Sequence, residues 1–124
     1  MSNNMSYDPN NIFAKILRGD IPCKKIFEND HVLAFHDIHP QAPIHALVIP
    51  KGAFVDYADF AANASDVQSA AFTKAIGEIA KLLGAHEQGY RLISNCGVNA
   101  HQEVPHYHVH ILAGRALGPM LSGK

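Results

Sequence analysis

The sequence contains no tryptophan, only two cysteines and no long apolar run. Cys23 and Cys96 are far apart and form no Cys-x-x-Cys pair, which argues against a disulfide framework and against a structural zinc site. No apolar stretch approaches the roughly 20 residues that a membrane-spanning helix requires. The first ten residues lack the basic start and the apolar segment of a secretory signal. We therefore expect a cytoplasmic protein whose thiols are reduced.

An excess of charge of either sign is also missing. The formal net charge is −1, with 10 Lys and Arg against 11 Asp and Glu, and the basic residues are scattered. This balance argues against nucleic acid or a membrane as a partner, because such polyanionic surfaces select basic patches. With 124 residues, 48% of them hydrophobic, the chain suits one compact domain. We expect a flexible tail over residues 1–10 and a single domain over residues 11–124.

Two segments have the apolar periodicity of helices. Residues 11–18 predict a short helix that ends before a glycine. Residues 65–84 predict a long amphipathic helix, because Ser65 and Gln68 have the spacing of a capping box and apolar residues follow at helical intervals. Gly77 lies inside this helix. It would either allow a close approach to a neighbouring element or be tolerated at some cost in stability.

Alternating apolar residues and turn signals predict the remaining elements. Five strands are expected, at residues 24–27, 32–36, 45–50, 90–95 and 106–114. Residues 53–64 are rich in Ala and Asp and yield no firm prediction. Strands in hairpin-like succession, with one long helix inserted among them, indicate an α+β fold. We expect a mainly antiparallel five-stranded sheet with one long and one short helix.

Histidine, by contrast, is abundant. The chain has nine histidines, and the segment PHYHVHIL (105–112) carries His106, His108 and His110 at alternate positions. In an extended strand alternate side chains share one face, so the three rings would line up while Tyr107 and Val109 packed on the other face. Ring nitrogens need hydrogen-bond partners, solvent, a metal or a substrate. The strict alternation therefore favours a functional site over an accidental polar face.

Two chemistries fit such a row of imidazoles. They could hold zinc with one position left open for water, or a neutral imidazole could attack phosphorus as a nucleophile. Glu103 is the only acid close in sequence, which weakens the metal interpretation because metal-bound histidines are usually oriented by a carboxylate or carbonyl. The preceding loop offers amides and a glycine suited to phosphate oxygens, at Asn95, Gly97, Asn99 and Gln102. Phosphoryl chemistry is therefore favoured.

The segment HYHVHIL (106–112) has the pattern His-apolar-His-apolar-His-apolar-apolar, and the chain resembles the histidine triad (HIT) superfamily. It is most similar to the Hint branch, the purine nucleoside phosphoramidases, over nearly everything from residue 11 onward. The matching segments are IFAKILRGDIP (12–22), LAFHDIHPQAPIHALVIPK (33–51), NCG (95–97), QEVPHYHVHILAGR (102–115) and LGPML (117–121). The resemblance implies a homodimer whose sheet continues across the two protomers. It implies no cofactor and no metal, since Asn11 and Ala14 replace the zinc-binding Cys-x-x-Cys of some relatives.

The resemblance also implies catalytic roles. His108 would attack the α-phosphorus of a nucleoside 5′-phosphoramidate or a related adenylate, and water would release the nucleoside monophosphate from the nucleotidyl-histidine. For Nε2 to attack, Nδ1 must keep its proton, and the expected acceptor is the backbone carbonyl of His106. His110 would bind a phosphate oxygen or help to protonate the leaving group. His106 and His45 would form a supporting polar network.

A purine nucleotide is the substrate class that the resemblance implies. Asn95 and the backbone near Gln102 and Glu103 would bind phosphate, and Asp37 would accept hydrogen bonds from the ribose hydroxyls. The purine would be enclosed by Ile12, Phe13, Ile16, Phe35, His36 and Ile38. Without the resemblance, these six would be read as ordinary core residues. His101 stands where many relatives have glycine, so a phosphate contact there is not carried over.

Other functions stay open at this point. A dinucleoside polyphosphate hydrolase of the same superfamily would use the same histidines, and a nucleotide-binding adaptor would retain the pocket with incidental catalysis. A metalloprotein is a minor alternative. A nucleotidyl transferase is disfavoured, because that branch has glutamine where this chain has His110. The chain also lacks the Trp-containing tail of animal relatives, so the leaving group cannot be inferred from them.

Overall fold

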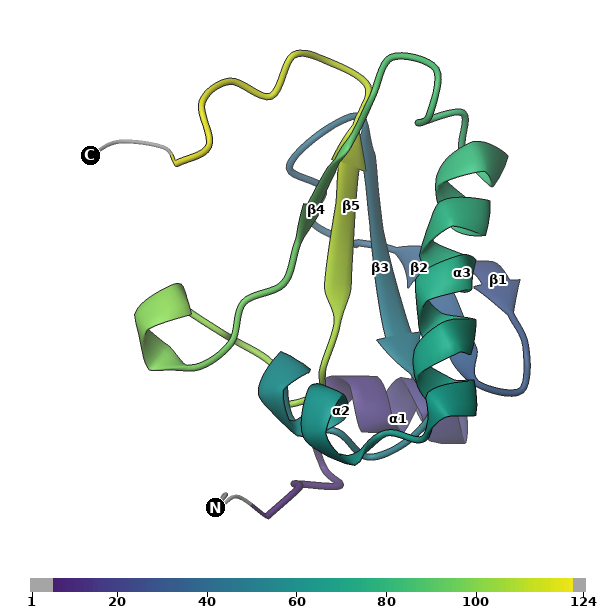
Figure 1. The fold of residues 1–124 in the computed structure, drawn as a ribbon, viewed down its shortest axis with the longest axis vertical. Helices are drawn as coiled ribbons and strands as arrows, with labels where there is room; N and C mark the ends of the chain where they lie inside the picture. Colours follow the sequence, from purple (N-terminus) through teal and green to yellow (C-terminus); the bar gives the residue numbers. More distant parts are fainter. Residues whose placement is uncertain (1–5, 122–124) are drawn as a thin grey trace.

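The computed structural model describes residues 6–121, and they form an α+β fold (Figure 1). The helices are α1 (Ile12–Arg18), α2 (Tyr57–Asn63), α3 (Asp66–Leu82) and the 3-10 turn η1 (Val98–Ala100). The strands are β1 (Lys25–Glu28), β2 (Val32–His36), β3 (Ile44–Pro50), β4 (Arg91–Ile93) and β5 (Val109–Ala113). They make one antiparallel five-stranded sheet in the order β1-β2-β3-β5-β4. The predicted fold class is confirmed, with α2 as a helix beyond the two that were expected.

Apolar residues cover both faces of the central strands. In β2, Val32 and Ala34 face α3, whereas Leu33 and Phe35 face α1, as the alternation of a strand requires. The long helix α3, which Figure 1 shows running alongside the sheet, contributes Phe72, Ala75 and Ile79 to its side of the core. The predicted packing residues Tyr107 and Val109 belong to the same cluster. The α1 side is filled by Phe13, Leu33, Phe35, Leu47 and Ile49.

The predicted starts of both helices are confirmed by capping hydrogen bonds. At the start of α1, the Asn11 side chain accepts from the backbone N–H of Ala14 at 2.9 Å. At the start of α3, the Ser65 hydroxyl accepts from the N–H of Gln68, and the Gln68 side chain accepts from the N–H of Ser65. Such caps satisfy N–H groups that have no partner inside the helix. They define the residue at which each helix begins.

Helix α2 lies within residues 53–64, for which we made no firm prediction. The Asp56 carboxylate caps it by accepting from the N–H of Asp59, and the Asp59 carboxylate accepts from the N–H of Val55, each at 2.8 Å. Phe60 is its one buried residue and packs against Phe54. A single buried residue leaves little apolar periodicity to detect, so the capping aspartate was the only usable signal.

Strand β5 begins at Val109, three residues later than predicted. Before it, the N–H of His106 donates to the Val104 carbonyl and the N–H of Tyr107 to the Phe54 carbonyl, both at 2.8 Å. Because these two N–H groups donate to carbonyls outside the sheet, His106 and Tyr107 do not pair with a neighbouring strand. Consequently His110 alone of the three alternating histidines lies in the strand, and His106 and His108 precede it.

Part of the N-terminal prediction lies outside the described residues. Residues 1–5 and 122–124 are not described, so the flexibility predicted for the tail stays a prediction. Residues 7–10 do contact the domain: the Arg18 guanidinium donates to the Pro9 carbonyl at 2.6 Å. No helix within residues 6–121 is both long enough and apolar enough to cross a membrane.

The surroundings of Gly77 lead to a stability prediction. A Cβ added there would meet no atom within 4 Å, so the close approach considered for this glycine does not occur within the chain. We expect Gly77→Ala to raise the free energy of unfolding by about 0.5–1 kcal/mol, because alanine loses less backbone entropy in a helix. Urea denaturation measures this change.

Gly52→Ala is the matched control, for which we expect the free energy of unfolding to fall. Its Cβ would lie 2.6 Å from the Phe54 ring, so this variant should lose stability. A loss of stability in Gly77→Ala would contradict the prediction and would mean that another surface packs against this part of α3.

Candidate active site

A pocket of about 320 Å³ opens between α1, the end of β2 and the residues that lead into β5. This volume falls within the range of about 300–1,000 Å³ typical of small-molecule sites. All six residues predicted to enclose a base line it: Ile12, Phe13, Ile16, Phe35, His36 and Ile38. The predicted polar residues that line it are Asp37, Asn95, Glu103, His108 and His110. The structure thus brings together residues from four separate parts of the sequence.

The apolar wall of the pocket is also part of the core. Phe13 and Phe35 are buried and their rings meet edge to face, with centroids 5.6 Å apart. Phe13 also packs edge to face on the His108 ring at 5.0 Å. Ile12 and Ile38, by contrast, are 43% and 77% exposed. The two phenylalanines therefore belong to the core as well as to the pocket wall, and the binding of a base by these residues stays a prediction.

The protonation of His108 follows from one hydrogen bond. Its Nδ1 is 2.7 Å from the backbone carbonyl oxygen of His106, the acceptor predicted from the sequence. A carbonyl can only accept, so the proton of the neutral ring lies on Nδ1 and Nε2 carries the lone pair. Burial lowers the pKa of His108, against opposing contributions from that hydrogen bond and from nearby acids. The ring is therefore a neutral base with a nucleophilic Nε2.

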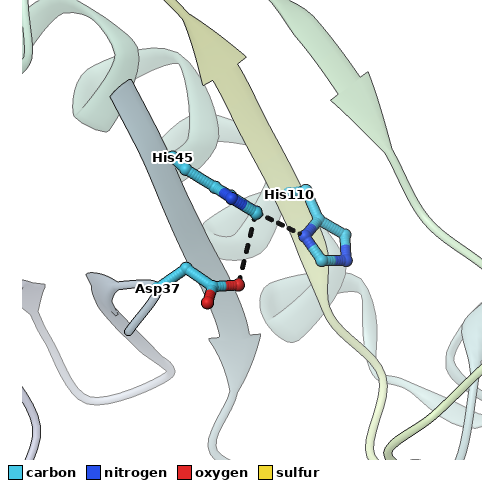
Figure 2. A group of neighbouring side chains, drawn as sticks. All are labelled: Asp37, His45 and His110. Atoms are coloured by element: carbon cyan, nitrogen blue, oxygen red, sulfur yellow. Dashed lines mark hydrogen bonds and ion pairs between the residues drawn. The ribbon is translucent and has the colours of Figure 1, made fainter. Parts of the chain in front are cut away.

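His110 has the opposite arrangement, which is set by His45 (Figure 2). The N–H of Gln41 donates to His45 Nδ1 at 3.0 Å, so the proton of neutral His45 lies on Nε2. That nitrogen is 2.9 Å from His110 Nδ1 and 3.4 Å from Asp37 Oδ2. His110 Nδ1 therefore accepts, and its Nε2, which points away from His45 in Figure 2, carries the proton. His108 and His110 present one acceptor and one donor, with ring centroids 5.1 Å apart.

The sheet register explains why these groups meet. His110 of β5 lies directly opposite Leu47 of β3, and His45 lies two residues before Leu47. Opposite residues share a face and so do alternate ones, which makes His45 and His110 diagonal neighbours on the α1 face. The N–H of Asp37 donates to the His45 carbonyl at 3.0 Å, which places the aspartate beside them.

Glu103 is the only acid close to the three histidines in sequence, but the fold brings a second acid to them. Asp37 is distant in sequence, but the pairing of β2 with β3 brings its carboxylate to His45. One Asp37 oxygen, Oδ1, accepts from the N–H of His39 at 2.8 Å. Glu103 lies at the exposed rim of the pocket, where its carboxylate is 3.1 Å from His101 Nε2. The negative charge nearest the histidine pair is therefore that of Asp37.

Asp37, His45 and His110 have the composition of a metal centre, and their ligand atoms lie within 4.8 Å of one another. A metal on His45 Nε2 would need that nitrogen's lone pair and would place the ring proton on Nδ1. His45 Nδ1 already faces the N–H of Gln41, and two donors cannot share a hydrogen bond. The three residues therefore fit a hydrogen-bond network better than a metal site.

His106 and Gln102, like His45, are not among the residues that line the pocket. His106 is fully buried and hydrogen-bonds to the Pro50 carbonyl at 2.9 Å and to the Tyr7 hydroxyl at 2.6 Å. Within residues 6–121, no hydrogen bond joins it to His45. The single supporting network that we expected is therefore two separate networks.

Gln102 organises the loop instead of facing a ligand. Its side-chain oxygen accepts from the N–H of Gly97, and its amide nitrogen donates to the carbonyls of Val55 and Val104. Its own backbone N–H donates to the Gly97 carbonyl at 3.2 Å. These groups of Gln102 therefore have partners within the chain, and phosphate binding by the backbone near Gln102 and Glu103 stays a prediction.

Sequence reasoning missed several contributors to the site. Six further residues line the pocket: Ile21, Pro22, Cys23, Leu47, His101 and Val104. Gln41 acts through a backbone N–H, which no side-chain pattern reveals, and Tyr7 lay in the expected tail. His101 has φ 62, a left-handed conformation that is uncommon for a residue with a Cβ. The sequence analysis singled it out only because many relatives have glycine at this position.

Comparison with known proteins gives concordant matches. Residues 18–117 match the model of the HIT domain. A HIT-like protein from Azospirillum brasilense is 62% identical over 117 residues, covering 94% of this chain and 96% of that protein. A protein named purine nucleoside phosphoramidase, from Escherichia coli, is 44% identical over 113 residues, which cover 91% of this chain and 94% of that protein. The solved structure of a HIT family hydrolase from Clostridium thermocellum matches with a TM-score of 0.82 at 41% identity. The match covers 90% of this chain and 96% of that one.

The buried histidines predict how stability depends on pH. Burial lowers the pKa of His106 from 6.5 to about 4, so between these values the unfolded chain binds a proton that the folded chain does not. The free energy of unfolding should therefore fall as the pH drops from about 6.5 to about 4, by up to about 1.4 kcal/mol per pH unit for one histidine. Chemical denaturation at several pH values measures this slope.

His106→Leu should remove this part of the slope, since it removes the titrating group. His86→Ala is the matched control, because His86 is exposed and should leave the slope unchanged. An equal slope in wild type and His106→Leu would contradict the assignment of a buried neutral imidazole.

Proposed function

This chain belongs to the HIT family, and on that premise we propose that it is a hydrolase acting at the α-phosphorus of purine nucleoside 5′-phosphoramidates or related adenylates. The observation that carries the proposal is the pair of opposite protonation states at the pocket. His108 offers a lone pair at Nε2, and His110 offers an N–H. A nucleophile beside a hydrogen-bond donor is what substitution at a phosphoryl group requires.

The proposed reaction has two steps. In the first, His108 Nε2 forms a bond to the α-phosphorus and the bond from phosphorus to the leaving nitrogen or oxygen breaks. In the second, water attacks the nucleotidyl-histidine, and the nucleoside monophosphate departs. His108 is positive in the intermediate, and it becomes neutral again when water bonds to phosphorus and the bond from Nε2 to phosphorus breaks. The leaving amine takes up one proton in the first step and the attacking water releases one in the second, so the protons balance. His110 Nε2–H would donate to a phosphoryl oxygen or to the leaving group.

The surroundings of His108 support its role as the nucleophile. Its low pKa keeps the lone pair available at neutral pH, because the ring remains unprotonated. When Nε2 bonds to phosphorus the ring becomes positive, and its Nδ1–H then donates a stronger hydrogen bond to the His106 carbonyl. The Asp37 carboxylate also favours positive charge on His108. These interactions are stronger in the charged state than in the resting state, which is the condition for catalysis.

The pocket is suited to a purine nucleotide. Its exposed isoleucines and phenylalanine edges form an apolar wall against which a base could pack, with Asp37 and Asn95 as polar neighbours. We propose that Asp37 Oδ2 accepts from the ribose and that Asn95 contacts phosphate. Neither contact requires a basic cluster, in keeping with the balanced charge of the chain. The homodimer and the cytoplasmic location stay predictions.

The test is hydrolysis of an adenosine 5′-phosphoramidate by wild type and His108→Ala. Wild type should release the nucleoside monophosphate, and the variant should lose at least about 10⁴-fold in kcat, since removing a covalent nucleophile abolishes the first step. His86→Ala, at an exposed position, is the control and should keep full activity. Quenching wild type in alkali, where a phosphorus–nitrogen bond survives, should trap one nucleotidyl group on His108.

The substrate class is tested in the same assay with diadenosine polyphosphates. We expect a higher kcat/KM for the phosphoramidate. The reverse order would favour a dinucleoside polyphosphate hydrolase. Tight binding of the nucleoside monophosphate without turnover of either substrate would favour a binding adaptor, and either result would overturn the proposed activity.

A further inference from the structure

Tyr7 precedes the part of the chain that matches the HIT domain, yet it contacts the buried centre of the histidine network. Its hydroxyl oxygen is 2.6 Å from His106 Nδ1. The two rings also pack edge to face, with centroids 5.6 Å apart and planes at 69°. Tyr7 does not line the pocket. Any effect on the reaction must therefore pass through His106.

The direction of the Tyr7 hydrogen bond follows from the other side of the His106 ring. His106 Nε2 is 2.9 Å from the Pro50 carbonyl oxygen, which can only accept, so Nε2 carries the proton. Nδ1 then has the lone pair and accepts from the Tyr7 O–H. Both ring nitrogens of a side chain with 0% exposure are thus satisfied. Without Tyr7, the Nδ1 lone pair would be buried with no donor.

The segment that carries Tyr7 is held against α1 by further hydrogen bonds. The Asn11 side chain, which caps α1, donates to the Asp8 carbonyl at 2.7 Å, and Arg18 donates to the Pro9 carbonyl at 2.6 Å. Asn11 itself is buried. Two kinds of contact therefore define the position of Tyr7: its own hydrogen bond to His106, and the hydrogen bonds that hold the residues after it against α1.

His106 connects this contact to the proposed nucleophile through its backbone. The carbonyl of His106 accepts from His108 Nδ1 at 2.7 Å, and the N–H of His106 donates to the Val104 carbonyl at 2.8 Å. With its side chain held at both nitrogens, the residue has little freedom to rotate. The carbonyl that orients His108 is thus fixed by contacts on the far side of the His106 ring.

We propose that Tyr7 is a positioning residue for the reaction, whose hydroxyl holds His106 so that the carbonyl of His106 keeps His108 Nδ1–H in place. This proposal rests on the proposed role of His108 as the nucleophile. It extends the functional unit to a residue that precedes the matched domain, and it explains why a histidine outside the pocket belongs to the alternating motif.

The test is Tyr7→Phe, which removes the hydroxyl and keeps the ring. We expect kcat for the phosphoramidate to fall about tenfold, the rate factor of one hydrogen bond, with KM unchanged because Tyr7 does not touch the pocket. Tyr90→Phe is the control, since Tyr90 is 40% exposed and its hydroxyl makes no hydrogen bond within the described residues. It should leave both constants unchanged. An unchanged kcat in Tyr7→Phe, or a higher KM alone, would overturn the proposal.

Two further measurements separate positioning from a loss of stability and from a failure of the proposed function. In His106→Ala, adding Tyr7→Phe should lower kcat no further, because the two residues act in series. An additive loss would overturn the proposal. The Nδ1–H resonance of His108 in the folded protein should also shift in Tyr7→Phe and stay in place in Tyr90→Phe. This resonance needs no substrate, so an unchanged signal overturns the role of Tyr7 even if wild type proves inactive on phosphoramidates.

Discussion

The hydrogen bond from His108 Nδ1 to the backbone carbonyl of His106 determines which nitrogen of His108 faces the pocket as a base. A backbone carbonyl cannot take the proton from the ring, so the tautomer is set by the fold and not by a titrating neighbour. The carbonyl is in turn held in place by the turn that takes residues 105–107 out of the sheet. The late start of β5 is therefore a requirement of the site.

The neighbouring histidine depends on the sheet in a different way. Backbone pairing of β2, β3 and β5 brings Asp37, His45 and His110 together, and the Gln41 N–H selects the tautomer of His45. Because His45 then donates from Nε2 to His110 Nδ1, the tautomer of His110 is determined as well. Two adjacent imidazoles of the same intrinsic basicity thereby acquire opposite roles, one with a lone pair and one with a proton. The difference originates from two backbone groups, the His106 carbonyl for His108 and the Gln41 N–H for His45 and His110. The pocket therefore needs neither a metal nor a basic cluster to produce it.

Much of this arrangement is predictable from the sequence, and the failures have physical reasons. Capping residues and apolar periodicity located α1, α3 and the strands, and the resemblance assigned eleven residues that do line the pocket. The proximity of Asp37 was missed because strand register, not sequence distance, brings it to His45. Gln41 was missed because its contribution is a backbone N–H. The role of the Gln102 side chain in closing the loop was missed, because an amide suited to phosphate is equally suited to that role.

The most direct test of the central claim is long-range ¹⁵N–¹H NMR of the imidazole rings in the wild-type protein near neutral pH, which identifies the protonated nitrogen of each neutral histidine. The structure predicts a proton on Nδ1 and a free Nε2 for His108, and the reverse for His110. A His108 ring that carried its proton on Nε2, or on both nitrogens, would contradict the account, because the pocket would then contain no nucleophile.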